Sequence, residues 1–314
     1  MNFDDTSEAR TLEDGLSVPD YPGAVRPSRR FVVDAGGVDI SVVEWGDPAA
    51  PPLLLAHGGF DFAETMNVFA PMLVAGGWRV VSWDHRGHGD SEWAALYSWE
   101  ADIRDASFVL GSIDAPRVPI IGHSKGGVML LHLAEVFPHR ISAVVNLDGL
   151  PSHRFVPDVA EQRQKMLAAA AKDWLDHRAR LVGHERPPGT VEGLAERRGR
   201  MNPRHDIEWL KYLVHVGAKH DVDGWRWKID PILRMGGFGP WRPDWSMARL
   251  PSIRVPFMGV LGMELEMMGW GTLPGDVEPW LPPGARFETL DGVGHFVHIE
   301  QPRAVADLVL EFLG

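Results

Sequence analysis

A serine between two glycines, at the junction of an apolar strand and an apolar helix, is the feature that most restricts the fold of this chain. Residues 118–123 have the composition of a buried strand, Gly-His-Ser-Lys-Gly occupies 122–126, and residues 128–137 have that of a helix. A strand that turns into a helix so abruptly needs small side chains at the bend, and the two glycines meet that need. This pattern is typical of a nucleophile elbow, which exposes the serine hydroxyl above the strand ends. We therefore predict that Ser124 is a nucleophile.

Strand-like and helix-like segments alternate over most of the remaining sequence. The strand-like apolar runs lie at residues 31–33, 40–45, 52–56, 79–84, 141–148, 255–261 and 286–290. The first two flank a Gly-Gly turn and read as a hairpin, whereas helical stripes separate most of the others. Repeated strand and helix units of this length predict an α/β fold, with a mostly parallel sheet and helices on both faces.

Three regions differ in their pattern, and they predict the domain organisation. Residues 151–250 show no convincing strand, are rich in charge, Trp and Arg, and carry helical stripes, which predicts an inserted helical cap, or lid. Residues 30–150 and 251–314 on either side of the cap form the predicted core. Residues 1–29 are polar, acidic and contain proline, a composition that predicts a flexible N-terminal arm.

The overall composition argues against several classes of function. A net charge of −12 without a face rich in Lys and Arg disfavours nucleic-acid binding. The absence of cysteine removes disulfides, thiolate metal sites and cysteine nucleophiles. The sequence shows neither an apolar run of signal-peptide type near its start nor a segment long enough to cross a bilayer. We therefore expect a cytoplasmic protein with no membrane partner.

One histidine is placed to act as the base that a serine nucleophile needs. A serine hydroxyl is a weak nucleophile at neutral pH, and a base within hydrogen-bond distance activates it. His295, one of 14 histidines, lies in a glycine-rich loop between the last strand and the last helix, where it would reach the strand ends beside Ser124. Its place in the chain order serine, acid, histidine also favours it. We expect His298 to pack behind or support His295.

The carboxylate that would orient the base has two candidate locations. Asp148 lies at the end of the strand after the elbow helix, 148 − 124 = 24 residues beyond the nucleophile, which leaves room for one helix and one strand. Glu264 and Glu266 follow the strand after the cap. We favour Asp148 as the acid and keep Glu264 and Glu266 open as alternatives.

The sequence also offers candidate residues that would hold the transition-state oxyanion and line the substrate pocket. Two backbone N–H groups directed at one point can hold an oxyanion, and the candidates are the amides of Gly59, after the third strand, and Lys125, after the nucleophile. Phe60, His123 and Trp270 are the candidate residues of the substrate pocket. Because the cap region is rich in Trp and Met, we expect a largely apolar pocket between cap and sheet.

Four motifs together make the chain resemble the α/β-hydrolase superfamily. They are His57-Gly58-Gly59, the run at residues 83–91, the elbow, and the run at residues 294–302, and they cover most of the chain outside the cap and the first 30 residues. Within the superfamily, residues 57–61 and 147–150 are most similar to the serine hydrolase-like group. The resemblance implies an α/β-hydrolase fold with a cap inserted before the strand that precedes the histidine loop.

The resemblance also bears on the acid and on the reaction. The family usually has a carboxylate three positions beyond a glycine after the post-cap strand, but Leu265 stands there, which favours Asp148. Epoxide hydrolases and haloalkane dehalogenases of the superfamily use an aspartate nucleophile, and Ser124 therefore disfavours those activities.

The resulting hypothesis is a serine hydrolase, without metal or cofactor, that cleaves medium-sized and mostly apolar carboxylic esters or lactones through an acyl-enzyme. We expect it to act on a small-molecule substrate as a monomer or homodimer. Thioesters stay open as substrates. Alternatives on the same fold are a carbon–carbon bond hydrolase, a perhydrolase, or a catalytically silent protein that binds a small molecule in the same pocket.

Overall fold

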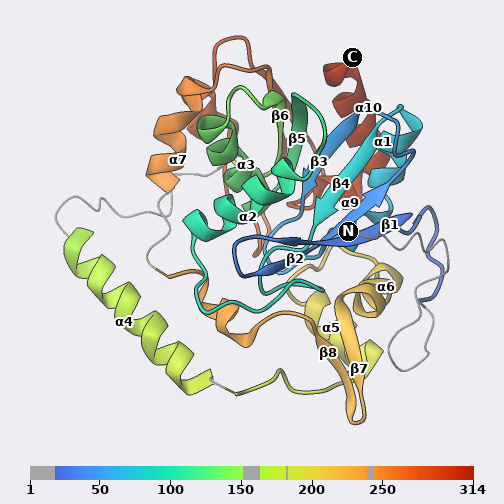
Figure 1. Cartoon of the computed structure of the whole chain (residues 1–314), viewed down its shortest axis with the longest axis vertical. Coiled ribbons are helices and arrows are strands. Elements are labelled where there is room, and N and C mark those ends of the chain that lie inside the picture. The colour runs from blue at the N-terminus through green and yellow to red at the C-terminus, as the bar shows by residue number, and fades with distance from the viewer. Residues whose placement is uncertain (1–17, 151–162, 182, 239–242) are drawn as a thin grey trace.

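An eight-stranded sheet forms the centre of the protein (Figure 1). The structure is a computed structural model that describes residues 18–150, 163–181, 183–238 and 243–314. In their order across the sheet, the strands are β1 (Arg29–Asp34), β2 (Asp39–Trp45), β4 (Arg79–Trp83), β3 (Pro52–Ala56), β5 (Val118–His123), β6 (Ile141–Leu147), β9 (Phe257–Gly262) and β10 (Arg286–Leu290). β2 pairs antiparallel with β1 and with β4, and all other pairs are parallel. The predicted mostly parallel sheet is confirmed.

Helices cover both faces of the sheet, as predicted (Figure 1). Successive strand residues point to opposite faces. Leu54 of β3 therefore packs in the cluster that includes α2 and α3, while Leu55 packs in the cluster that includes α1 and α10. The helices of the core are α1 (Ala70–Ala75), α2 (Trp99–Gly111), α3 (Lys125–Val136), α8 (Pro274–Val277), α9 (Val297–Glu300) and α10 (Pro302–Leu313), with short 3₁₀ helices η1 (Ala63–Asn67), η3 (Leu250–Ser252) and η4 (Glu278–Trp280). No helix among the described residues has both the length and the apolar character to cross a membrane.

The parallel strands bring three chemically important loops to one edge of the sheet. Ser124 directly follows β5, Asp148 directly follows β6, and His295 lies in the loop after β10. Since parallel strands end at the same edge, these residues meet there although they are far apart in sequence.

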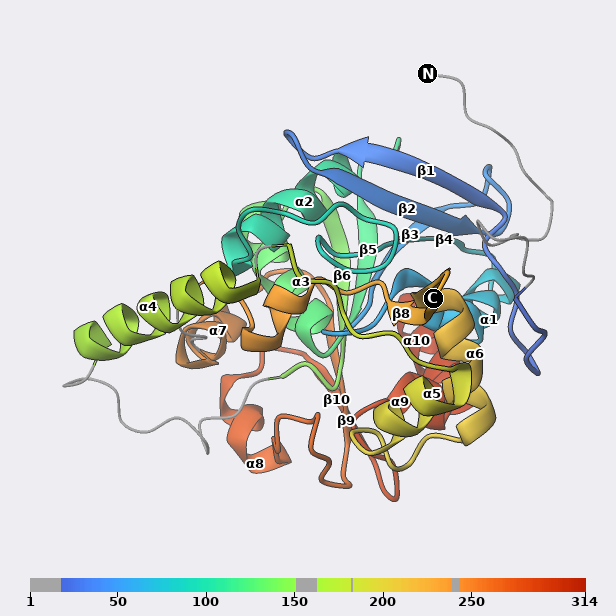
Figure 2. The ribbon, with the colours of Figure 1, turned by 90° about the horizontal axis from the view of Figure 1, so that it is seen from below.

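The segment between β6 and β9 is mainly helical in its described part. It contains α4 (Arg163–Leu181), α5 (Val191–Gly199), α6 (Ile207–Gly217), η2 (Pro231–Met235) and α7 (Pro243–Arg249). α4 lies at the periphery of the molecule in both views (Figure 2). Residues 151–162, 182 and 239–242, within the predicted cap, lie outside the described residues.

This inserted segment also contains a strand pair that the sequence pattern did not predict. β7 (Ala218–Asp221) and β8 (Gly224–Trp227) form an antiparallel hairpin. Each strand has four residues and carries charged side chains, so neither shows the apolar run or clear alternation by which strands are recognised. The expectation of a cap without strands was therefore wrong at these residues.

The described part of the N-terminal region is packed, which differs from the expected flexible arm. The Tyr21 ring lies 5.1 Å from that of Trp209 and 5.5 Å from that of Tyr212, centroid to centroid. The indole of Trp45 in turn donates a 2.9 Å hydrogen bond to the carbonyl of Val25. Aromatic burial of this kind fixes a segment that its polar composition would leave loose. Residues 1–17 of the predicted arm lie outside the described residues.

Candidate active site

The turn at Ser124 has the backbone geometry of a sharp strand-to-helix bend. Ser124 adopts φ 51° and ψ −121°, a left-handed conformation that is rare for residues other than glycine. Its N–H donates to the carbonyl of Leu147 on the neighbouring strand at 3.0 Å, which holds the strained residue in place. The turn brings Gly122 so close to Gly126 that a Cβ on Gly122 would lie 2.6 Å from the Gly126 backbone.

This close approach gives a first test of the elbow. Gly122→Ala should lower the free energy of unfolding by about 1–3 kcal/mol, because the added methyl has backbone rather than a flexible side chain to displace. Gly111→Ala, in helix α2, is the control, because a Cβ there meets no atom within 4 Å, and it should leave stability unchanged or raise it by up to about 1 kcal/mol. Urea unfolding of both variants measures the difference. Equal stabilities would contradict the described turn.

The structure brings Ser124, His295 and Asp148 into one hydrogen-bonded chain. Ser124 Oγ lies 2.9 Å from His295 Nε2, and His295 Nδ1 lies 2.5 Å from Asp148 Oδ2. The backbone N–H of Gly262 donates to Asp148 Oδ1 at 3.2 Å and fixes the carboxylate. All three members of the chain are buried. Burial raises the pKa of Asp148 from its ordinary value, while the hydrogen bonds from His295 and Gly262 act in the opposite direction.

The indole of Trp270 determines the direction of the hydrogen bonds among Ser124, His295 and Asp148. Its Nε1–H donates to Ser124 Oγ at 3.2 Å, so the hydroxyl hydrogen of Ser124 can point to the ring of His295. A neutral His295 that accepts this proton at Nε2 carries its own proton at Nδ1, which donates to Asp148. This is the tautomer in which the ring can act as the base for Ser124.

The alternative acids do not reach the ring of His295 in this structure. Glu266 Oε2 accepts a 2.8 Å hydrogen bond from the backbone N–H of His295, and thus supports the loop rather than the imidazole. Glu264 is exposed to solvent. Of the three carboxylates that the sequence left open, Asp148 is the one hydrogen-bonded to the ring.

The two candidate oxyanion amides belong to loops that touch beside the nucleophile. Lys125 is the first residue of α3, so its N–H has no partner within the helix. A Cβ built on Gly59 would lie 3.8 Å from Lys125 Cβ, which puts the two backbones side by side. The next amide, that of Phe60, donates to Nε2 of His88 at 3.2 Å and is already satisfied. Gly59 and Lys125 therefore remain the candidate pair.

A residue of the inserted segment holds the loop that contains Gly59. Arg198 of α5 donates from Nη1 to the carbonyl of Phe60 at 3.0 Å and from Nη2 to Asp61 Oδ1 at 2.7 Å. Burial raises the pKa of Asp61, and the adjacent Arg198 charge partly offsets this shift. No local pattern signals this contact, because Arg198 is 137 residues from Asp61 in the chain.

His57 after β3, and His85 and Asp84 after β4, have structural roles. The backbone N–H of His85 donates to His57 Nε2 at 3.0 Å. Burial lowers the pKa of His57 to about 3, so that ring is a neutral hydrogen-bonding group. Asp84 accepts from the backbone of Ala63 at 2.8 Å and of Asp90 at 2.9 Å, and burial raises its pKa to about 6. This network joins the segment that follows β3 to the segment that follows β4.

A cavity of about 500 Å³ opens over the Ser124 hydroxyl. The three residues expected to form the substrate pocket, Phe60, His123 and Trp270, all line it. The ring of His123 is fully buried, and its Nε2–H donates to the carbonyl of His295 at 2.9 Å. The other lining residues are Gly59, Trp99, Ser124, Lys125, Met268, Gly269, His295 and Phe296. The apolar side chains of the lining are Phe60, Trp99, Met268, Trp270 and Phe296, and they suit an apolar part of a substrate. Within the described residues, no group of three or more His, Asp or Glu side chains is arranged to hold a metal ion.

His298 packs behind the site, and its lowered pKa can be tested by the pH dependence of stability. Its ring lies 4.4 Å from that of His123 and 5.9 Å from that of Phe69, and neither ring nitrogen has a hydrogen-bond partner among the described residues. Burial, together with His205 and His295 nearby, lowers the pKa of His298 from 6.5 to about 3.

The folded state therefore binds the His298 proton more weakly than the unfolded state does, and stability is lost as the pH falls from 6.5 towards 3. This loss is about 1.4 kcal/mol per pH unit for one histidine. His298→Leu should reduce the slope of unfolding free energy against pH by about that amount in this window. Urea unfolding at several pH values measures the slope, with exposed His139→Leu as the control. An unchanged slope in the His298 variant would contradict the assignment.

Comparison with known proteins agrees with the fold. The sequence model of the Alpha/beta hydrolase family matches residues 53–308. The chain therefore belongs to the alpha/beta hydrolase family, and the resemblance noted in its motifs is confirmed.

Individual relatives differ in the reaction that their names state. The chain is 24% identical over 277 residues to a serine hydrolase-like protein of Danio rerio, covering 86% of this chain and 83% of that protein. It is 27% identical over 316 residues to epoxide hydrolase A of Mycobacterium tuberculosis (strain ATCC 25618 / H37Rv), covering 91% and 97%. It is also 28% identical over 213 residues to the esterase Rv0045c of that organism, covering 67% and 66%. The solved structure of that esterase aligns with a TM-score of 0.69 over 92% of both chains, at 23% identity. These relatives support a hydrolase and leave its substrate open.

Proposed function

We propose that this protein is a serine hydrolase that cleaves carboxylic esters or lactones through an acyl-enzyme on Ser124. The observation that carries the proposal is the 2.9 Å contact between Ser124 Oγ and His295 Nε2, with Asp148 on the other ring nitrogen. A serine that shares its proton with an oriented imidazole is the arrangement by which hydroxyl groups become nucleophiles. The relative Rv0045c is named an esterase, which agrees with this chemistry.

The proposed reaction follows from the roles of these groups. Ser124 Oγ attacks the ester carbonyl while His295 Nε2 takes its proton, and Asp148 stabilises the imidazolium that forms. The Gly59 and Lys125 amides hold the negative oxygen of the tetrahedral intermediate. His295 then gives its proton to the leaving alcohol oxygen, and the acyl group stays on Ser124. Water, activated by the same histidine, releases the acid and restores the hydroxyl.

The cavity supports a medium-sized, mostly apolar substrate. Its volume of about 500 Å³ lies within the range of small-molecule sites, and aromatic side chains form much of its wall. We assign residues 151–250 to a cap over the site, because Arg198 from this region holds the loop of Gly59 in place. On this assignment, the cap limits access of water and of bulky substrates.

A substrate panel tests the proposed function. The panel contains p-nitrophenyl esters of increasing acyl length, an aliphatic lactone, a thioester and a styrene oxide control, which is included because epoxide hydrolase A is a relative. We expect turnover of esters or lactones, highest at intermediate chain length, and no epoxide opening. Epoxide turnover alone would overturn the proposal. Tight binding of the esters without turnover would favour a silent binding protein.

A further inference from the structure

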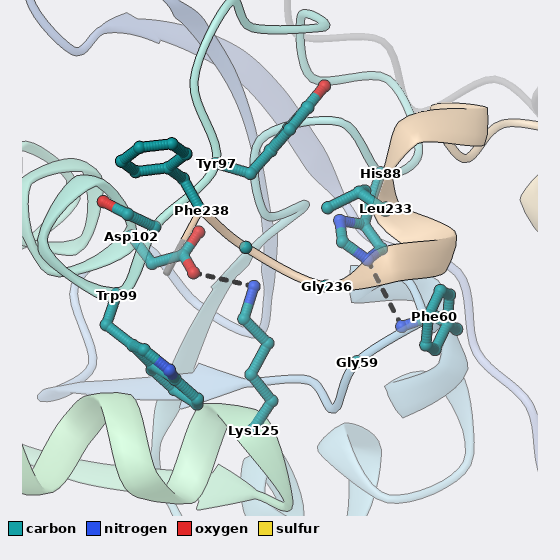
Figure 3. A pocket seen from close by; sticks show the side chains of 12 residues that line it. Gly59, Phe60, His88, Tyr97, Trp99, Asp102, Lys125, Leu233, Gly236 and Phe238 are labelled. Atoms are coloured by element: carbon teal, nitrogen blue, oxygen red, sulfur yellow. Dashed lines mark hydrogen bonds and ion pairs between the residues drawn. The ribbon is translucent and has the colours of Figure 1, made fainter. Parts of the chain in front are cut away.

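A second cavity of about 210 Å³ adjoins the catalytic cavity. Gly59, Phe60, Trp99 and Lys125 line both spaces, so the two cavities meet beside the candidate oxyanion amides. The remaining wall of the second cavity comes from His88, from the start of α2 with the two residues before it, and from the cap segment around Phe238 (Figure 3). We call this second space the side cavity.

Hydrogen bonds between core and cap hold the walls of the side cavity in place. The backbone N–H of Phe238 donates to the carbonyl of Tyr97 at 2.5 Å. The hydroxyl of Tyr97 donates to Asp230 Oδ2 at 2.6 Å and accepts from the backbone of Ala94 at 3.0 Å. These bonds join two separate parts of the chain, and they fix the walls of the side cavity relative to each other.

One ion pair supplies the charge inside this mainly apolar space. Lys125 Nζ lies 2.7 Å from Asp102 Oδ2, and both side chains line the cavity (Figure 3). The Lys125 side chain is 22% exposed, and that of Asp102 is 5% exposed. An ammonium has three donor hydrogens, and one carboxylate oxygen engages one of them. Lys125 can therefore donate to a further oxygen in the cavity.

Three other polar side chains lie in the wall, those of His88, Tyr97 and Ser98, and the Ser98 hydroxyl accepts from the backbone N–H of Ala101 at 3.2 Å. His88 donates from Nδ1 to the Arg86 carbonyl at 3.0 Å and accepts from the Phe60 amide at Nε2. Its pKa is lowered well below 6.5, mainly by burial, so it stays neutral. The Tyr97 hydroxyl is held by its two partners. Lys125 is thus the cationic donor that a substrate would meet.

The balance of charge indicates which oxygen would bind. Asp102 already compensates the positive charge of Lys125, so a substrate carboxylate would leave an excess negative charge in a partly dry cavity. A neutral carbonyl or hydroxyl oxygen adds no charge, and it can still accept a charge-assisted hydrogen bond from the ammonium. The pair therefore favours a neutral oxygen on an otherwise apolar chain.

The position of His295 indicates which half of the ester faces the side cavity. The imidazole must protonate the leaving alcohol oxygen, so the alcohol part lies on the side of the catalytic cavity formed by Met268, Trp270 and His295. None of these three residues lines the side cavity. The acyl part, which extends from the carbonyl held at Gly59 and Lys125, is the half that faces the side cavity.

We propose that the side cavity is an acyl subsite, in which Lys125 Nζ binds a neutral carbonyl or hydroxyl oxygen carried on the apolar acyl chain of the substrate. This inference rests on the proposed ester hydrolysis and adds to it a substrate class: oxo- or hydroxyacyl esters rather than plain alkanoates.

Matched pairs of p-nitrophenyl esters test the subsite. Each pair has the same acyl length, with or without one oxo group, and the oxo group moves carbon by carbon along the chain. At one position, kcat/KM for the oxo ester should exceed that of its plain partner by about tenfold, the effect of one hydrogen bond to a charged group. Lys125→Met should reduce this ratio to within about twofold of unity. Lys211→Met, which removes a lysine from an exposed pair with Glu208, should keep the ratio.

Two further measurements distinguish a failure of the subsite from a failure of the proposed function. Lys125→Met leaves Asp102 buried without its cation, so the neutral double variant Lys125→Met/Asp102→Asn is measured beside it, and it should also lose the ratio. Reaction with a fluorophosphonate reports whether Ser124 is a nucleophile independently of the acyl group. Normal labelling and ester turnover with no oxo preference at any carbon would overturn the subsite alone. An oxo preference that survives both Lys125 variants would overturn it too. Absence of labelling and of turnover would overturn the proposed function itself.

Discussion

Ser124→Ala should abolish nearly all ester hydrolysis while the protein stays folded. The variant removes the only atom that becomes bonded to the acyl group, and in a comparable triad the loss of the serine costs about 10⁶ in kcat. We expect a loss of at least about 10⁴-fold. The melting temperature should change little, because Ser124 already adopts a positive φ and its hydroxyl contacts site residues rather than the core.

A matched serine gives the control for this result. Ser107 lies on the exposed side of α2, where its hydroxyl bonds to the Arg104 carbonyl of its own helix. Ser107→Ala should keep wild-type kcat/KM. Substantial turnover by a folded Ser124→Ala protein would show that another group forms the bond to the substrate, and the mechanism would then be wrong.

Asp148→Asn should lower kcat by at least about 10²-fold, and the equivalent change in a serine protease triad costs about 10⁴-fold. The amide keeps the shape of the carboxylate but removes the charge that stabilises the imidazolium, and it can favour the wrong tautomer of His295. The backbone should tolerate the change, because Asp148 has a φ of 47° and asparagine adopts this region readily.

Two glutamates that follow β9 provide the comparison. Glu264 is exposed, and Glu266 bonds to the backbone N–H of His295, which the amide oxygen of glutamine can also do. Glu264→Gln and Glu266→Gln should each stay within about tenfold of wild type, roughly 1.4 kcal/mol. A collapse of kcat in either glutamine variant, together with an active Asp148→Asn, would place the acid after the cap. Steady-state kinetics on one chromogenic ester compares all three proteins.

Much of this arrangement was predictable from local sequence patterns. The glycines around Ser124, the apolar strands on either side and the loop of His295 each carry a local signal. The parallel order of β5, β6 and β10 then requires their following loops to meet at one edge of the sheet. The position of Asp148 beside His295 depends on this topology, which explains why the sequence already favoured it.

Contacts between distant segments could not be predicted in the same way. Whether Glu266 reaches the ring or the backbone of His295 depends on the path of a loop, and sequence spacing does not determine that path. The bonds from Arg198 to Asp61 and from Trp270 to Ser124 join residues that are 137 and 146 positions apart. Such pairs follow from how the segment between β6 and β9 and the loops pack, and they leave no periodic signal in the sequence.

The most direct test of the proposed mechanism is the mass of the protein after reaction with a fluorophosphonate. We predict the addition of one phosphonyl group per chain, located by peptide mapping on Ser124, with loss of ester hydrolysis in proportion to the labelled fraction. The Ser124 hydroxyl is within 2.9 Å of its base, which is the geometry that makes it reactive. Modification at a different residue, or full ester turnover by protein labelled at Ser124, would contradict the central claim.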